Sequence, residues 1–126
     1  DWFGIRHLVC GPGTVEWTNP KVMRASMGAV FRLTVSEITS WEAPLTQLRN
    51  AGYSIFAADM DGLPPAQLEK TNHLVWALVL GNEAHGISAV AGRTADTTLS
   101  IPGEGSADSL NVAMAGTILF YELTKQ

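Results

Sequence analysis

The run at positions 74–80 is apolar throughout, and it limits the fold of this chain more than any other feature. Such a run is typical of a β-strand that helices cover on both faces, although the pattern alone does not separate it from a buried helical turn. Gly81, Asn82 and Glu83 follow directly, so small and polar residues lie at the carboxyl end of the expected strand, where open α/β sheets usually bind ligands. We therefore expect 74–80 to be a central strand of a largely parallel sheet.

The rest of the chain alternates short apolar runs with helical stretches, as an α/β domain does. Asn19 before Pro20 favours a helix start, and Gly52 suits the left-handed position just after a helix. Residues 59–65 are expected to form a loop. We expect further strands at 7–10, 33–35, 53–58 and 97–101, and helices at 20–28, 42–52 and 109–123.

The bulk properties favour one small domain without a metal. A chain of 126 residues is long enough for one compact domain and short for two, and no apolar run approaches the ~20 residues of a membrane span. The 8 Lys and Arg against 12 Asp and Glu argue against a polyanion binder held by charge alone, without excluding RNA. The single Cys10 and the scattered His7, His73 and His85 provide neither a disulfide framework nor metal-ligand spacing, so we expect a cytoplasmic protein with no metal.

Three segments stand out together, and their sequences are NPKVMRASMGA (19–29), LVLGNEAHGIS (78–88) and IPGEGSADSLNV (101–112). Their order and spacing resemble the SpoU/TrmH branch of the SPOUT methyltransferases, whose second motif resembles L-G-N-E-x-x-G-I-S and whose third resembles I-P-x-x-G-x-x-x-S-L-N-V. The resemblance covers essentially the whole chain. It implies one SpoU-type catalytic domain over 1–126 with an α/β knot, a trefoil-knotted, mostly parallel sheet flanked by helices. Periodicity does not show a knot, and only the resemblance supports one.

The resemblance also implies an activity, which is S-adenosylmethionine-dependent methyl transfer to a ribose 2′-hydroxyl of tRNA or rRNA. Such a reaction depends mainly on holding the sulfonium methyl in line with the hydroxyl while a base accepts its proton. In the family an arginine and an asparagine of the first motif serve that end. Residues 1–5 look like the tail of this motif, so both would lie upstream of Asp1. We expect an N-terminally truncated domain that binds the donor and by itself methylates nothing.

The second motif supplies candidates for donor binding and catalysis. Gly81 puts a residue without a side chain where backbone must approach a ligand, beside the polar Asn82 and Glu83. Alone, Gly-Asn-Glu would more often be a plain turn. By resemblance, Gly81 contacts the donor through its backbone and Glu83 helps to order the active loops. Ala84 stands where a glycine is common.

The third motif combines a bend at Pro102 with a helix start. Ser109 could be merely a helix cap, whereas Asn111, if buried at the start of an apolar helix, would need a ligand or a catalytic loop as a partner. By resemblance, Ser109 and Asn111 belong to the catalytic centre, and backbone around Ile101 and Leu110 holds the adenosine of the donor. Gly103 replaces the methionine often found after Ile-Pro, which removes a pocket contact.

Further candidates come from outside these two motifs. Ala58 matches a donor-pocket position, although an alanine there is equally a small core residue. Arg24 and Ser26 match a segment beside the substrate cleft and could meet an RNA phosphate, the alternative for Arg24 being an exposed helix arginine. The helix expected at 109–123 is apolar on nearly every side, which favours burial or an interface. By resemblance, it lies in a homodimer interface.

Two other functions compete with methyl transfer. One is a catalytically inactive nucleotide- or donor-binding α/β module that keeps the fold. The other is a flavodoxin-like or dinucleotide-binding domain, which requires a Gly-rich strand-to-helix turn early in the chain. The Gly11-Pro12-Gly13 turn fits this poorly because no clear helix opens after it.

Overall fold

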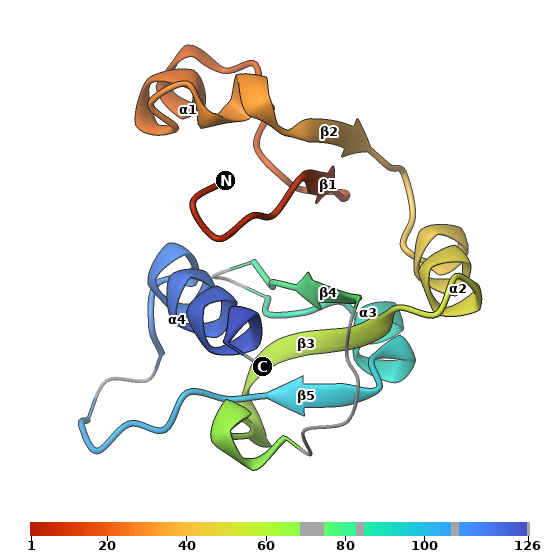
Figure 1. The fold of residues 1–126 in the computed structure, drawn as a ribbon, viewed down its shortest axis with the longest axis vertical. Helices are drawn as coiled ribbons and strands as arrows, with labels where there is room; N and C mark the ends of the chain where they lie inside the picture. Colours follow the sequence, from red (N-terminus) through yellow and green to blue (C-terminus); the bar gives the residue numbers. More distant parts are fainter. Residues whose placement is uncertain (69–74, 83–84, 107–108, 126) are drawn as a thin grey trace. The chain divides into compact units, whose positions relative to one another are not determined.

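The chain consists of two units, Asp1–Trp41 and Glu42–Gln126, each with its own parallel sheet (Figure 1). Both units also carry helices, so the predicted α/β class with parallel strands is confirmed. The computed structural model describes four stretches of the chain, 1–68, 75–82, 85–106 and 109–125.

The first unit is built on two parallel strands, β1 (His7–Cys10) and β2 (Thr34–Glu37). Their register places Cys10 opposite Glu37, and the ladder continues because the Ile38 N–H donates to the Cys10 carbonyl at 3.0 Å. β1 coincides with the predicted strand. β2 is shifted toward the C-terminus relative to the prediction.

Helix α1 (Pro20–Ala25) of the first unit begins as predicted and ends early. The Asn19 Oδ1 accepts from the Lys21 N–H at 2.9 Å, which caps the helix. The helix does not reach residue 28 because Met27 and Gly28 have positive φ angles of 50° and 81°, which a right-handed helix cannot contain.

The second unit has three parallel strands, with β3 (Ser54–Leu63) between β4 (Trp76–Val79) and β5 (Thr97–Leu99). The expectation that 74–80 is a central strand is therefore wrong for this sheet, in which β3 has a neighbour on each side. The first residue of that predicted run lies outside the described part of the chain. The loop expected at 59–65 is wrong in part, because β3 runs to Leu63, although residues 59–62 bulge between the two positions, Ala58 and Leu63, that pair with Leu99 of β5. β5 ends two residues earlier than predicted.

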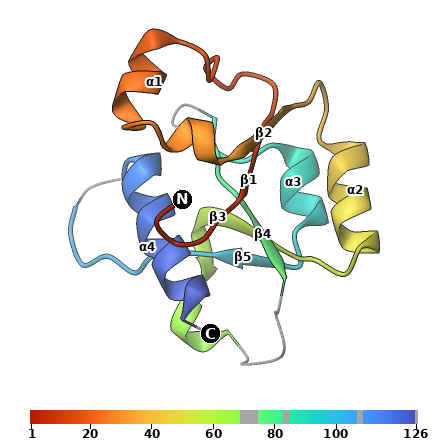
Figure 2. The same cartoon turned by 45° about the horizontal axis from the view of Figure 1, so that its top comes forward.

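Helices cover both faces of the three-stranded sheet. α2 (Glu42–Asn50) and α3 (Ala89–Thr94) lie together on one side, and α4 (Val112–Thr124) lies on the other (Figure 2). Ile55 and Ala57 are buried and alternate along β3 with the core residue Phe56, so the strand packs on both faces. The core cluster that includes α4 consists of Phe56, Leu68, Leu99, Leu119 and Leu123.

The helix bounds of the second unit differ in part from the predictions. α2 begins at the predicted residue and ends at Asn50, two residues before Gly52, whose φ of 85° confirms the expected left-handed position. α4 begins at Val112 rather than 109. No helix in the described part of the chain has the length and apolarity that a membrane crossing requires. Three short elements were not predicted: α3, and the 3-10 helices η1 (Ala29–Arg32) and η2 (Pro65–Gln67).

Candidate functional site

The register of the three-stranded sheet brings three of the predicted donor-binding residues to one edge. Ala58 is paired with Leu99, the last residue of β5, and the residue before Ala58 is paired with Val79, the last residue of β4. Gly81 and Ile101 each lie two residues beyond these strand ends. Because all three strands are parallel, Ala58, Gly81 and Ile101 lie at the same carboxyl edge, where α/β sheets bind their ligands.

The loop after β4 is closed by its own backbone. The Asn82 N–H donates to the Gly86 carbonyl at 3.0 Å, and the Gly86 N–H donates to the Asn82 carbonyl at 2.8 Å. A Cβ atom on Gly81 would lie 2.4 Å from the Gly86 carbonyl carbon and 2.6 Å from the Ile87 nitrogen. The close approach of the loop backbone therefore requires a glycine at position 81 by itself, and the predicted contact of Gly81 with a donor stays a prediction. Glu83 and Ala84 lie outside the described residues.

The third motif ends in the N-terminus of α4. The Asn111 Oδ1 accepts from the Ala113 N–H at 2.9 Å, so Asn111 rather than Ser109 caps this helix. Asn111 is also exposed, so the burial that would have required a partner is not found, and its catalytic role stays a prediction. The cap uses only the oxygen of the amide, and its NH₂ group remains a donor of the kind that a catalytic centre needs. Ser109 and Leu110 are exposed just before the helix.

Two of the predicted donor-binding residues also belong to the core. Ala58 and Ile101 are half-buried, and both pack against the cluster around Phe56 and Leu119. The interpretation of Ala58 as a small core residue is therefore supported by its contacts. Ile101 could still meet a ligand through its backbone groups, because the β5 ladder ends before it.

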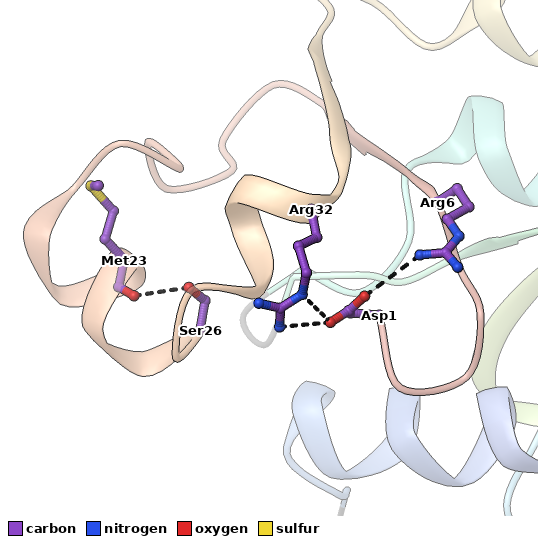
Figure 3. Close-up of polar contacts among 5 residues, drawn as sticks. All are labelled: Asp1, Arg6, Met23, Ser26 and Arg32. Atoms are coloured by element: carbon purple, nitrogen blue, oxygen red, sulfur yellow. Dashed lines mark hydrogen bonds and ion pairs between the residues drawn. The ribbon is translucent and has the colours of Figure 1, made fainter.

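Arg24 and Ser26, the predicted RNA-binding residues, lie in the first unit at the end of α1. The Ser26 hydroxyl donates to the Met23 carbonyl at 2.8 Å, which ties the turn to the helix (Figure 3). Arg24 is exposed in the last turn of α1. Ser26 thus has a local structural role, and the exposed guanidinium of Arg24 is the group of the pair that can reach a phosphate.

An ion-pair cluster in the first unit was not predicted. The Asp1 carboxylate accepts from the Arg32 Nε at 2.8 Å and lies 2.7 Å from the Arg32 Nη2, with the Arg6 Nη1 3.8 Å from its other oxygen (Figure 3). Asp1 and Arg32 are 31 positions apart in the sequence. Only the fold brings this pair together, so no local pattern could have indicated it.

The first unit also contains an open pocket of about 420 Å³ with a mixed polar and apolar lining. Burial and the nearby Glu37 carboxylate raise the pKa of the Cys10 thiol above its ordinary value, which keeps it protonated and weakly nucleophilic at neutral pH. Within the described ranges, no group of three or more His, Cys, Asp or Glu side chains is arranged to hold a metal ion. The pocket is lined by Cys10, Gly11, Thr14, Val15, Glu16, Glu37, Ile38 and Thr39.

Comparison with known sequences gives matches over nearly the entire chain. The model of the SpoU rRNA Methylase family matches residues 1–121. An uncharacterized tRNA/rRNA methyltransferase of Archaeoglobus fulgidus is 31% identical over all of this chain and 55% of its own length. The 23S rRNA (guanosine(2553)-2′-O)-methyltransferase of Bacillus subtilis is 31% identical over 98% of this chain and 49% of its own. The chain spans about half the length of the curated relatives it matches.

Solved structures agree in fold. A TrmH-family protein from Porphyromonas gingivalis has a TM-score of 0.85 at 37% identity, over 97% of this chain and 49% of that one. The SpoU methyltransferase AviRb of Streptomyces viridochromogenes, crystallised with AdoMet, has a TM-score of 0.88 at 30% identity, over 100% of this chain and 49% of that one. The match to the family model, the sequence identities and the shared fold show that the chain belongs to the SpoU rRNA methylase family.

Proposed function

We propose that this protein transfers a methyl group from S-adenosylmethionine to a ribose 2′-hydroxyl of tRNA or rRNA. The observation that carries the proposal is the meeting of Ala58, Gly81 and Ile101 at the carboxyl edge of one parallel sheet. Family membership supports it, as do the names of a relative that methylates a 2′-oxygen and of one crystallised with AdoMet. We take residues 1–126 to be one SpoU-type catalytic domain with the family's knot, acting in the cytoplasm.

The residues at this edge fit an adenosine ligand. Adenosine sites combine apolar surface with a few backbone hydrogen bonds. Ile101 offers apolar surface, and the backbone of Gly81 and Ile101 lies beyond the ends of the strand ladders. The family resemblance adds the exposed Leu110 to this site. S-adenosylmethionine, when bound, supplies an electrophilic methyl group. The protein's part is to hold that methyl in line with the ribose oxygen.

The catalytic candidates have separate tasks in this proposal. The Asn111 side chain, fixed as the α4 cap, can donate its amide NH₂ to the reacting ribose. Ser109, exposed two residues earlier, can hydrogen-bond the same group. Glu83 orders the loop that Gly81 opens. We assign the proton-accepting role to none of the described side chains.

Donor titration and methyl transfer test the proposal. For the protein expressed from its complete gene, we expect calorimetry to show binding of S-adenosylmethionine and S-adenosylhomocysteine, and none of NAD or FMN. Labelled methyl groups should move from the donor to tRNA or rRNA. Binding without transfer would favour the inactive donor-binding module, and binding of NAD or FMN alone would contradict the family assignment of the site.

Arg24 is proposed to contact an RNA phosphate, and Arg93 provides a matched control. Each is an exposed arginine in the last turn of a six-residue helix. We expect Arg24→Ala to weaken RNA binding about fivefold. The slope of log K against log salt concentration should fall by about 1, as expected for the loss of one phosphate contact. Filter binding at several salt concentrations measures both. Equal effects of Arg24→Ala and Arg93→Ala would show that only general charge matters.

We also propose a homodimer that α4 helps to form. Met114, Ile118 and Tyr121 lie at helical spacing on one side of α4, opposite the buried Leu119 and Leu123, and all three are exposed. An apolar stripe on each side of one helix is more than a single core requires. The family resemblance adds that a second subunit completes the substrate site.

A further inference from the structure

β3 and β5 separate and rejoin at the edge where the donor is proposed to bind. Ala58 and Leu63 are both paired with Leu99, so residues 59–62 are extra residues of β3 and form a large bulge. Met60 within this bulge is 63% exposed, whereas Leu63 packs against the core again. The bulge therefore projects from the sheet directly after the candidate donor-binding position Ala58.

The base of the bulge is held by Ser100. The Ser100 hydroxyl donates to the Gly62 carbonyl at 2.7 Å, and the Ser100 N–H donates to the Leu63 carbonyl at 3.1 Å. Ser100 is only 8% exposed. In the described part of the chain, it is the one polar residue that is buried. Buried hydrogen bonds of this kind are costly to leave unmade, so the hydroxyl fixes where the bulge returns to the sheet.

Gly62 completes this attachment because it has no side chain. A Cβ atom on Gly62 would lie 2.7 Å from the Leu99 carbonyl carbon, 2.8 Å from the Thr98 oxygen and 2.9 Å from the Ser100 nitrogen. The backbone of the bulge thus rests directly on the end of β5. Any side chain at this position would push the bulge away from Ile101, the next candidate residue along that strand.

We propose that Ser100 is a positioning residue for the methyl donor, which acts through Gly62 by holding the 59–62 bulge as a fixed wall beside the adenosine. The inference rests on the proposed function, since the bulge lies between Ala58 and Ile101 in the register of the sheet. Without this bond, the bulge would have to become ordered when the donor binds. The entropic cost of that ordering would make the free energy of donor binding less favourable.

Removing the Ser100 hydroxyl tests the inference in the protein expressed from its complete gene. We expect Ser100→Ala to raise the donor Kd about fivefold, as the loss of one hydrogen bond would. The KM for the donor should rise equally, with kcat unchanged at saturating donor, because the reacting groups are untouched. Ser100→Thr keeps the hydroxyl and should restore most of the affinity.

Thr46→Val is the matched control for Ser100→Ala. It removes a hydroxyl bond of similar length, from the Thr46 Oγ1 to the Glu42 carbonyl at 2.8 Å, within α2. It should leave the donor Kd unchanged. If Ser100→Ala lowered the free energy of unfolding but left the donor Kd at the wild-type value, Ser100 would be merely structural and the inference overturned.

Gly62→Ala tests the same attachment from the other strand. It also provides the test of the inference if Ser100→Ala does not fold. We expect it to raise the donor Kd as well, and the double variant with Ser100→Ala to be little weaker than the worse single variant, because both release one bulge. Fully additive effects would contradict a shared attachment. If the unmodified protein bound no donor, the proposed function would fail and the inference with it; normal binding with an unaffected Ser100→Ala would overturn the inference alone.

Discussion

Gly81→Ala is expected to reduce donor affinity about 100-fold or more, which corresponds to about 2.7 kcal/mol. The added methyl group would lie 2.4 Å from the Gly86 carbonyl carbon, inside van der Waals contact with backbone that cannot rotate away. The loop could accept it only by opening the paired hydrogen bonds between Asn82 and Gly86. Since this loop forms one side of the proposed donor site, calorimetric titration with S-adenosylmethionine measures the effect directly.

Gly92→Ala is the control for this prediction. Gly92 lies in α3, and its added methyl group would meet only the Ile87 Cδ1, at an ordinary 3.5 Å. Alanine in a helix interior is favoured over glycine by about 0.5–1 kcal/mol, so this variant should be as stable as the wild type or more so, with unchanged affinity. Unchanged donor affinity in Gly81→Ala, with the same folded spectrum, would place the donor away from this loop.

The sheet and its ligand edge could be predicted because they depend on local patterns. The apolar run before Gly81 and the aromatic and aliphatic residues after Gly52 identified β4 and β3. The position of β4 beside β3 rather than at the centre of this sheet could not be read in the same way. Strand order depends on which strands pair. An all-apolar run indicates that a strand is buried, but it does not indicate which strands lie beside it.

Tertiary contacts overrode local propensity where the predictions failed. The Asp59–Gly62 sequence has the composition of a turn, yet it continues β3 because Leu63 pairs with Leu99 and Gly62 rests on the end of β5. The six residues of α3 are mostly small and include a glycine, too few to show a helical period.

The candidate site was predicted by motif, and the physical roles of its residues needed the structure. Ser109 and Asn111 can both cap a helix, and only the backbone at Asn111, with φ −54° and ψ 138°, identifies it as the cap of α4. Gly81 was expected to let the backbone approach a ligand, which stays a prediction, and the structure adds that the backbone of Gly86 approaches it closely. A glycine in a motif indicates that some group comes close to the backbone there, but the pattern does not identify that group.

Single charges on α4 should separate its two apolar sides. Leu119 is 1% exposed in the core cluster, so Leu119→Asp buries a carboxylate without a partner and is expected to unfold the protein. Even Leu119→Ala should lower the free energy of unfolding by about 2–5 kcal/mol, which urea denaturation measures. A folded and stable Leu119→Asp would contradict the packing of α4 against the sheet.

Ile118→Asp, one residue earlier, is expected to leave the fold intact and to convert the dimer to a monomer. Ile118 is 38% exposed and lies between Met114 and Tyr121 in the outward stripe, so a charge there is solvated in the monomer and buried in the proposed interface. Ala113→Asp is the control, because Ala113 is exposed in the first turn of α4 on a side away from the stripe. Light scattering at micromolar concentration should give a dimer for the wild type and Ala113→Asp, and a monomer with a native circular-dichroism spectrum for Ile118→Asp. A wild-type monomer at that concentration would exclude the dimer, whereas a dimer unaffected by Ile118→Asp would move its interface away from this side of α4.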